Sequence, residues 1–213
     1  MPLKSRKTAL IILRVLIMFA VTSTPMLFAA RQQSIFVQAN LGGGYGIYSE
    51  KVQGTGEKFT MSSPGGLGMF QAGGSLSRNV KFWGFVSGFY MPSPKPSSDS
   101  VQSGATYKYS LQHDLGLGMT FYTNSNFFLA LGGSVASNNV RFVKEGFDVY
   151  TNTQHGWGAH ATFGYEISLS AHLSWSLALF GYYGQVRDVG SAVYFDSLGS
   201  NMIFGAMTGI SFN

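Results

Sequence analysis

Apolar residues alternate with polar or small residues from Gly104 to Tyr122. A period of two predicts a β-strand, because successive side chains of a strand point to opposite faces of the sheet. The predicted apolar face carries aromatic residues near both ends. A strand that crosses a bilayer at a tilt needs roughly 9–11 residues and has aromatic residues at both interfaces. The segment therefore predicts one strand of a transmembrane barrel.

The alternation assigns each residue of this segment to one of two faces. The apolar face, expected against lipid, holds Ala105, Tyr107, Tyr109, Leu111, His113, Leu115, Leu117, Met119 and Phe121. The opposite face, expected in the lumen, holds Gly104, Thr106, Lys108, Ser110, Gln112, Asp114, Gly116, Gly118, Thr120 and Tyr122.

Seven further segments show the same kind of pattern. The expected strands are Ser34 to Tyr48, Gly65 to Ser77, Val80 to Met91, Gly104 to Tyr122, Phe127 to Val140, Gly156 to Leu169, Leu173 to Gln185, and Met202 to Phe212. Tight connections follow the second, fourth and sixth segments, and long polar connections follow the first, third, fifth and seventh. An even strand count with short periplasmic turns and long extracellular loops is typical of bacterial outer-membrane barrels. The sequence thus predicts an all-β fold, an eight-stranded antiparallel transmembrane β-barrel.

A soluble eight-stranded barrel such as a lipocalin is the rival all-β interpretation. A soluble barrel turns its apolar face inward and shows water many charged side chains. The polar face of the segment from Leu173 to Gln185 carries no charge, and the first strand is similar. This pattern favours the membrane barrel.

Aromatic residues also sort toward the two rims of the expected barrel, as the interfacial girdles of membrane proteins do. The predicted girdle consists of Tyr45, Tyr90, Tyr107, Tyr109, Phe121, Trp157, Tyr165, Trp175, Tyr183 and Phe212.

Composition supports a membrane protein. Charged residues make up 11% of the 213 residues, whereas a soluble domain typically carries about 25%. There are 28 glycines and no cysteine, so a disulfide framework and a thiolate metal site are excluded. No zinc spacing, phosphate-binding glycine loop or catalytic triad occurs, and no cofactor or metal is expected.

The first thirty residues have the form of a secretory signal peptide. A basic region with Lys4, Arg6 and Lys7 precedes an apolar stretch, and Ala29 and Ala30 offer a cleavage site. We expect residues 1–30 to be the signal peptide and residues 31–213 the outer-membrane β-barrel domain. Removal of the signal lowers the formal net charge from +5 to +1, which argues against a nucleic-acid partner.

Few charged residues fall within the expected strands. A lumen polar network is predicted from Lys108, Gln112, Asp114, His160 and Glu166, with Lys81 as a further candidate. Such a network can gate a narrow pore for ions or small solutes. It can equally be a set of satisfied ion pairs in a lumen too narrow to conduct, because eight strands leave room only for side chains.

His113 does not fit the pattern, because alternation points it toward lipid. A polar group there is costly and marks a possible functional site. One hypothesis is a lipid-A-modifying enzyme, but Ser110 and Asp114 fall on the opposite face. A bulge in the strand is the alternative, and a non-enzymatic protein is favoured.

The long connections hold other candidates. The stretch from Arg141 to Asn152 alternates on both sides of Glu145 and Gly146, which predicts a hairpin extending past the membrane. A turn is expected at Gly54 to Gly56, and the segment Pro92 to Ser100 is expected to be irregular. Aromatic residues of the loops are candidates for binding a host surface: Phe142, Phe147, Tyr150, Tyr194 and Phe195.

With these features the chain resembles the small eight-stranded outer-membrane proteins of the OmpA, OmpX and opacity type. The resemblance is one of architecture over the mature chain, and the last strand ends in Phe212 followed by Asn213. It implies an exported monomer in the bacterial outer membrane, in contact with lipid and lipopolysaccharide and inserted by the barrel-insertion machinery. The implied role is structural, surface interaction or adhesion, with variable loops as the site of an extracellular ligand.

Overall fold

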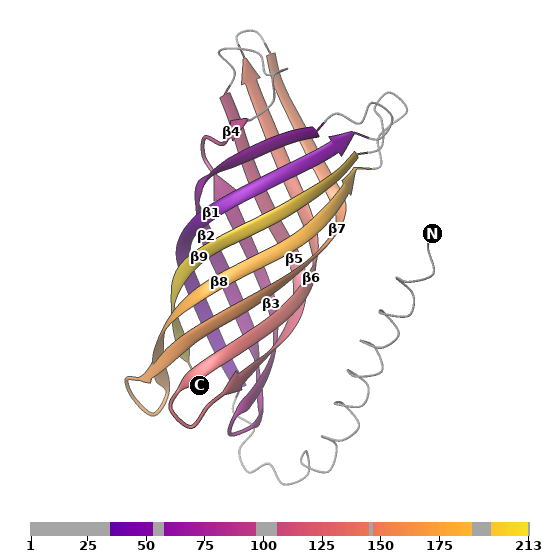
Figure 1. The fold of residues 1–213 in the computed structure, drawn as a ribbon. Helices are drawn as coiled ribbons and strands as arrows, with labels where there is room; N and C mark the ends of the chain where they lie inside the picture. The colour runs from indigo at the N-terminus through magenta and orange to yellow at the C-terminus, as the bar shows by residue number, and fades with distance from the viewer. Residues whose placement is uncertain (1–34, 53–57, 97–105, 145–146, 189–196, 213) are drawn as a thin grey trace.

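A computed structural model describes residues 35–52, 58–96, 106–144, 147–188 and 197–212 (Figure 1). The expected signal peptide and the expected turn at Gly54 to Gly56 lie outside these residues. No helix long and apolar enough to cross a membrane occurs within these ranges.

Nine strands make up the described chain. They are β1 (Ile35–Val52), β2 (Lys58–Ser77), β3 (Val80–Met91), β4 (Lys95–Pro96), β5 (Thr106–Tyr122), β6 (Phe127–Lys144), β7 (Phe147–Ser168), β8 (Leu173–Asp188) and β9 (Ser197–Phe212). All pairings are antiparallel, and the sheet closes because β1 pairs with both β2 and β9. The predicted eight-stranded antiparallel barrel is confirmed, with the two-residue strand β4 added beside β2.

The strands are longer than predicted, chiefly at the end of the barrel with the long connections, which we name the loop end. β2 begins at Lys58, β7 at Phe147 and β9 at Ser197. Backbone pairing continues there although the apolar alternation has ended, as at the pair of Lys51 and Lys58. The opposite end, the turn end, has short connections such as Arg78–Asn79 between β2 and β3. Part of the connection expected to be irregular, Lys95–Pro96, is the strand β4.

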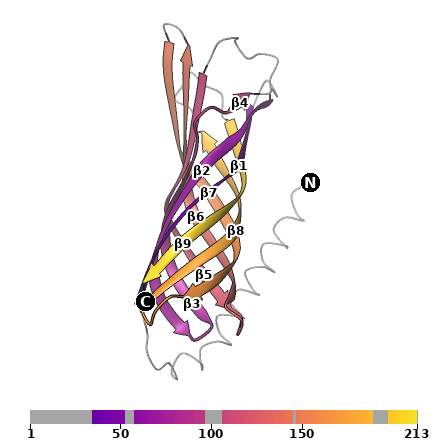
Figure 2. The same ribbon diagram turned by 90° about the vertical axis from the view of Figure 1, so that its left-hand side faces the viewer.

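Strands β5, β6 and β7 continue above the rest of the wall (Figures 1 and 2). The pairing of β6 with β7 extends to Lys144 and Phe147, whereas β7 pairs with β8 only from His155 onward. We name the part of β6 and β7 from 140 to 151 the projecting hairpin. The predicted alternation on both sides of Glu145 and Gly146 thus corresponds to continued pairing of β6 with β7, and its extension past the membrane stays a prediction.

The strict alternation predicted for β5 is wrong. A β-bulge places residues 113 and 114 opposite the single residue Ala136 of β6, where the register shifts between Gln112 and Leu115. An extra residue reverses the faces of the strand on one side of the bulge. Tyr109 and Leu111 are therefore buried in the lumen, each 1% exposed, while Leu115 and Leu117 face outward.

The outer wall is apolar. Large exposed side chains include Leu41 at 71%, Leu179 at 66% and Phe212 at 60%. Members of the predicted girdle that are exposed on this wall are Tyr45, Tyr90, Phe121, Trp157, Tyr165, Tyr183 and Phe212, and Trp175 is half-buried. Tyr109 is not part of a girdle, and the side chain of Tyr107 lies outside the description.

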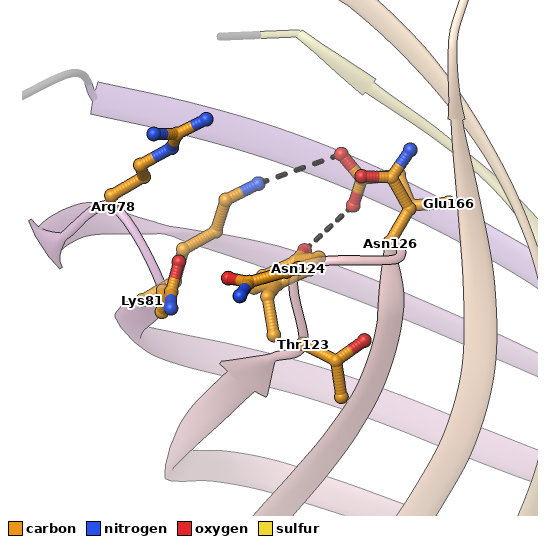
Figure 3. Close-up of a pocket in the computed structure, with 8 residues that line it drawn as sticks. Arg78, Lys81, Thr123, Asn124, Asn126 and Glu166 are labelled. Carbon is orange, nitrogen blue, oxygen red and sulfur yellow. Dashed lines mark hydrogen bonds and ion pairs between the residues drawn. The ribbon is translucent and has the colours of Figure 1, made fainter.

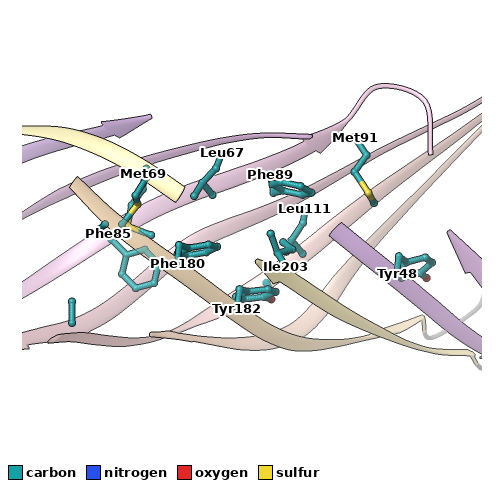
Figure 4. Packing of buried hydrophobic residues seen from close by; sticks show 14 of the residues in the cluster. Tyr48, Leu67, Met69, Phe85, Phe89, Met91, Leu111, Phe180, Tyr182 and Ile203 are labelled. Carbon is teal, nitrogen blue, oxygen red and sulfur yellow. The ribbon is translucent and has the colours of Figure 1, made fainter. Parts of the chain in front are cut away.

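The lumen is filled with buried side chains, most of them apolar and many of them large (Figure 4). Aromatic rings from one strand occupy the space that glycines leave on another. A Cβ added at Gly118 would collide with the Trp83 ring, and one added at Gly116 would collide with Phe85. At Gly132 the added Cβ would lie 2.6 Å from Cε1 of His160. The inward-facing glycines thus leave the space into which large side chains of other strands pack.

Candidate functional site

The lumen is filled in successive layers, and the layer nearest the loop end is built from tyrosine and asparagine. The rings of Tyr48 and Tyr109 lie 5.0 Å apart. Tyr109 Oη donates a hydrogen bond to Oδ1 of Asn201, and Tyr48 Oη donates to Oε2 of Glu50 over 3.0 Å. Tyr48, Tyr109 and Asn201 are all buried. They close the described lumen on this side.

His160 occupies the middle of the lumen inside a group of aromatic rings. Its imidazole stacks on Trp83 at 5.7 Å and meets the edge of Phe85 at 4.8 Å. The Phe180 ring lies 5.9 Å away. This histidine is 5% exposed, so it fills space in the core and has little access to solvent.

A layer of amides and hydroxyls follows toward the turn end. Trp83 Nε1 donates to Oγ1 of Thr120 over 2.8 Å. Gln38 Nε2 donates to Oδ1 of Asn40 over 2.8 Å, and Asn40 Nδ2 donates to Oε1 of Gln71 over 3.2 Å. These hydrogen bonds satisfy polar groups that would be costly to bury alone.

An ion pair closes the lumen at the turn end (Figure 3). Lys81 Nζ lies 3.8 Å from Oε1 of Glu166, and Tyr122 Oη donates to Oε2 of the same carboxylate over 2.6 Å. The lysine also lies over the rings of Phe36 and Tyr122, at 4.9 and 5.0 Å. Two rings and a carboxylate therefore hold the Lys81 ammonium in place.

A cavity of about 360 Å³ adjoins this ion pair, and we name it the turn-end cavity. Its lining comes from the β2–β3 turn and the start of β3, the end of β5 and the β5–β6 turn, and β7. The lining residues are Arg78, Asn79, Lys81, Tyr122, Thr123, Asn124, Asn126 and Glu166. The turn residues of this set are exposed, so the cavity is accessible from the rim.

Of the five residues of the predicted polar network, the structure describes the side chains of two, His160 and Glu166. His160 and Glu166 lie on the lumen face of β7, but in different layers: the first packs among aromatic rings and the second belongs to the turn end. Lys81, the further candidate, is the ion-pair partner of Glu166. The side chains of Lys108, Gln112 and Asp114 lie outside the description. Their predicted lumen position rested on the alternation that the bulge interrupts.

Sequence reasoning missed several of the aromatic residues that shape these layers. Trp83, Phe85 and Phe89 lie in the lumen, yet β3 is apolar on both faces and offers no alternation to orient it. Phe36 was missed because the next residues on the same face of β1, Gln38 and Asn40, are polar and do not indicate an aromatic core. In the part of the chain that the structure describes, no three histidine, aspartate or glutamate side chains gather closely enough to hold a metal ion.

No protein-family model matches the chain, and no curated protein matches it in sequence. The fold is similar to solved structures of several bacterial proteins. Neisserial surface protein A matches at 15% identity over 83% of this chain and 98% of that chain, with a TM-score of 0.43. Ail, the attachment invasion locus protein of Yersinia pestis, matches at 11% identity over 81% and 98%, with a TM-score of 0.44. The outer membrane protein OprG from Pseudomonas aeruginosa matches at 14% identity over 83% and 96%, with a TM-score of 0.42. The expected resemblance to small outer-membrane barrels is a likeness of fold, a closed antiparallel barrel of eight long strands.

Proposed function

We propose that this protein is a non-enzymatic barrel of the bacterial outer membrane that acts through its extracellular surface. Its role is surface structure, adhesion or envelope integrity, and its lumen does not conduct. The observation that carries the proposal is the combination of an apolar outer wall with a lumen filled by buried side chains. A broad exposed apolar surface indicates a lipid environment, and a closed barrel leaves no unpaired edge within it.

The orientation follows from the ends of the barrel. Short connections belong in the periplasm and long ones outside the cell. The turn end is then periplasmic, and the projecting hairpin extends from the cell surface beyond the headgroups. Export by the N-terminal signal, insertion by the barrel-insertion machinery, contact with lipopolysaccharide and a monomeric state belong to the same proposal.

A solute pore is the alternative that the polar lumen network raised. Ions would have to pass the Tyr48–Tyr109 layer, the rings around His160 and the Lys81–Glu166 pair in turn. The first two layers are built from buried side chains and the ion pair from half-buried ones, so a pore would need all three layers to move.

The location is tested by membrane fractionation combined with gel migration before and after heating. We expect the protein in the outer-membrane fraction, with a folded form that migrates differently from the heated one. A protein that stays soluble after export would contradict the proposal.

The surface role is tested by shortening the projecting hairpin. Val140 and Thr151 are directly paired, so an Asn-Gly turn can join them without changing the register. We expect the shortened variant to fold and reach the outer membrane, because the barrel wall below keeps its pairing. Binding of the bacteria to host cells or extracellular matrix should fall relative to bacteria with the full-length chain. Unchanged binding would show that the hairpin carries no surface role.

A further inference from the structure

The turn-end cavity is lined by many hydrogen-bond donors and carries a positive charge. Arg78 contributes a guanidinium, Lys81 an ammonium, and Asn79, Asn124 and Asn126 three carboxamides. Glu166 is the one carboxylate in the lining, so the two cations leave an excess of one positive charge. A donor-rich cavity of this sign suits an anion.

Both oxygens of the Glu166 carboxylate are engaged within the protein. Its Oε2 accepts the short hydrogen bond from Tyr122, and its Oε1 lies 3.8 Å from the Lys81 nitrogen. That separation makes an ion pair without a short hydrogen bond. Arg78 is exposed on the β2–β3 turn and approaches the cavity from the rim, on the Lys81 side (Figure 3).

The cavity is also preorganised. Tyr122 N donates to Asn79 O over 2.8 Å, which ties the two turns together, and Thr123 N donates to Phe127 O over 2.8 Å. Asn126 has a φ of 63°, a left-handed conformation that asparagine adopts more readily than most residues. Its carbonyl accepts a hydrogen bond from Glu166 N over 3.0 Å, which fixes the turn to β7. Turns whose backbone is fixed before binding lose less entropy when a ligand arrives.

We propose that the turn-end cavity binds a phosphate group, with Arg78 and Lys81 as its charged ligands and the turn carboxamides as further donors. The guanidinium fork matches two phosphate oxygens, and the ammonium supplies a point charge beside it. The volume of about 360 Å³ suits a phosphate with a small substituent. In the orientation proposed above, the cavity opens toward the periplasm beside the inner leaflet. The group then comes from a phospholipid headgroup or from free phosphate.

The test is calorimetric titration of the folded chain in a non-ionic, phosphate-free detergent at constant ionic strength. The probes are inorganic phosphate and dihexanoyl phosphatidylglycerol below its micelle concentration, with acetate for comparison. We expect phosphate-bearing probes to bind more tightly than acetate. Tighter binding of the lipid assigns the headgroup as the source, and tighter binding of inorganic phosphate assigns the free ion.

Three variants test whether binding depends on the charged residues of the cavity. Arg78→Ala should weaken binding about tenfold, the loss expected for one charge-assisted contact. Lys58→Ala, which removes an exposed cation at the loop end, should leave it unchanged. Glu166→Gln should strengthen binding, because it removes the competing charge while its amide oxygen still accepts from Tyr122.

Gel migration before and after heating establishes that each variant is folded. The proposal is overturned if neither phosphate probe binds, if acetate binds as tightly, or if folded Arg78→Ala binds as well as the unmodified chain.

Discussion

At the residue scale, the inward glycines of the barrel have a different role from the outward ones. Gly118 faces the Trp83 ring, so a methyl group there would occupy space that the indole already fills. Gly66 faces outward, and a Cβ added there would meet nothing within 4 Å. The inward glycine Gly118 is therefore needed for the packing of the lumen, whereas the outward position of Gly66 has room for a side chain.

This difference predicts opposite outcomes for the same chemical change. Gly118→Ala should lower the free energy of unfolding by about 1–3 kcal/mol, the usual cost of overpacking a core. Gly66→Ala should leave it unchanged or raise it by a few tenths, since alanine restricts the unfolded chain. Urea titration of the folded protein in lipid vesicles, followed by tryptophan fluorescence, measures both. Equal changes in the free energy of unfolding for the two substitutions would contradict the packing of Trp83 against Gly118.

At the scale of the strand, β5 shows why alternation alone was insufficient. Tyr109 and Leu111 on one side of the bulge and Leu115 and Leu117 on the other are all apolar. The apolar alternation in the sequence is therefore continuous across the bulge, although the first pair faces the lumen and the second pair faces outward. His113, the residue that the alternation left unexplained, lies at the bulge itself. An unexplained polar residue was the one sequence signal of the change in phase.

The bulge is tested by changing the length of β5. Deleting Asp114 removes the extra residue, so either Tyr109 and Leu111 or the outward leucines must move to the wrong face. We expect this deletion to abolish the folded, heat-sensitive form on gels. Asp114→Ala keeps the length and should retain that form. A deletion variant that folds as well as the substitution variant would contradict the bulge.

At the scale of the whole molecule, the barrel and its strand order were predictable from the sequence, and the filling of its lumen was not. The tight connections were placed correctly because turns interrupt the alternation on both sides, as at Arg78–Asn79. The lumen contents depend on which ring meets which glycine across the barrel, as Trp83 meets Gly118. Such pairs are set by strand tilt and shear, which the one-dimensional pattern does not carry.

The candidate site was predictable to a similar extent. Glu166 and His160 were expected in the lumen because β7 keeps a clean alternation from Gly156 to Ser168. The partners of Glu166 are Tyr122, which the alternation of β5 placed in the lumen, and Lys81 of β3, whose phase the sequence left open. Only the folded barrel brings Lys81, Tyr122 and Glu166 to one end.

The closed lumen is the central claim, and conductance across a planar lipid bilayer tests it most directly. The folded protein should insert without raising the current above the bare-membrane baseline, because three layers of packed side chains separate the two ends of the lumen. Reproducible single-channel steps from the purified, folded protein would contradict the closed lumen and favour the pore.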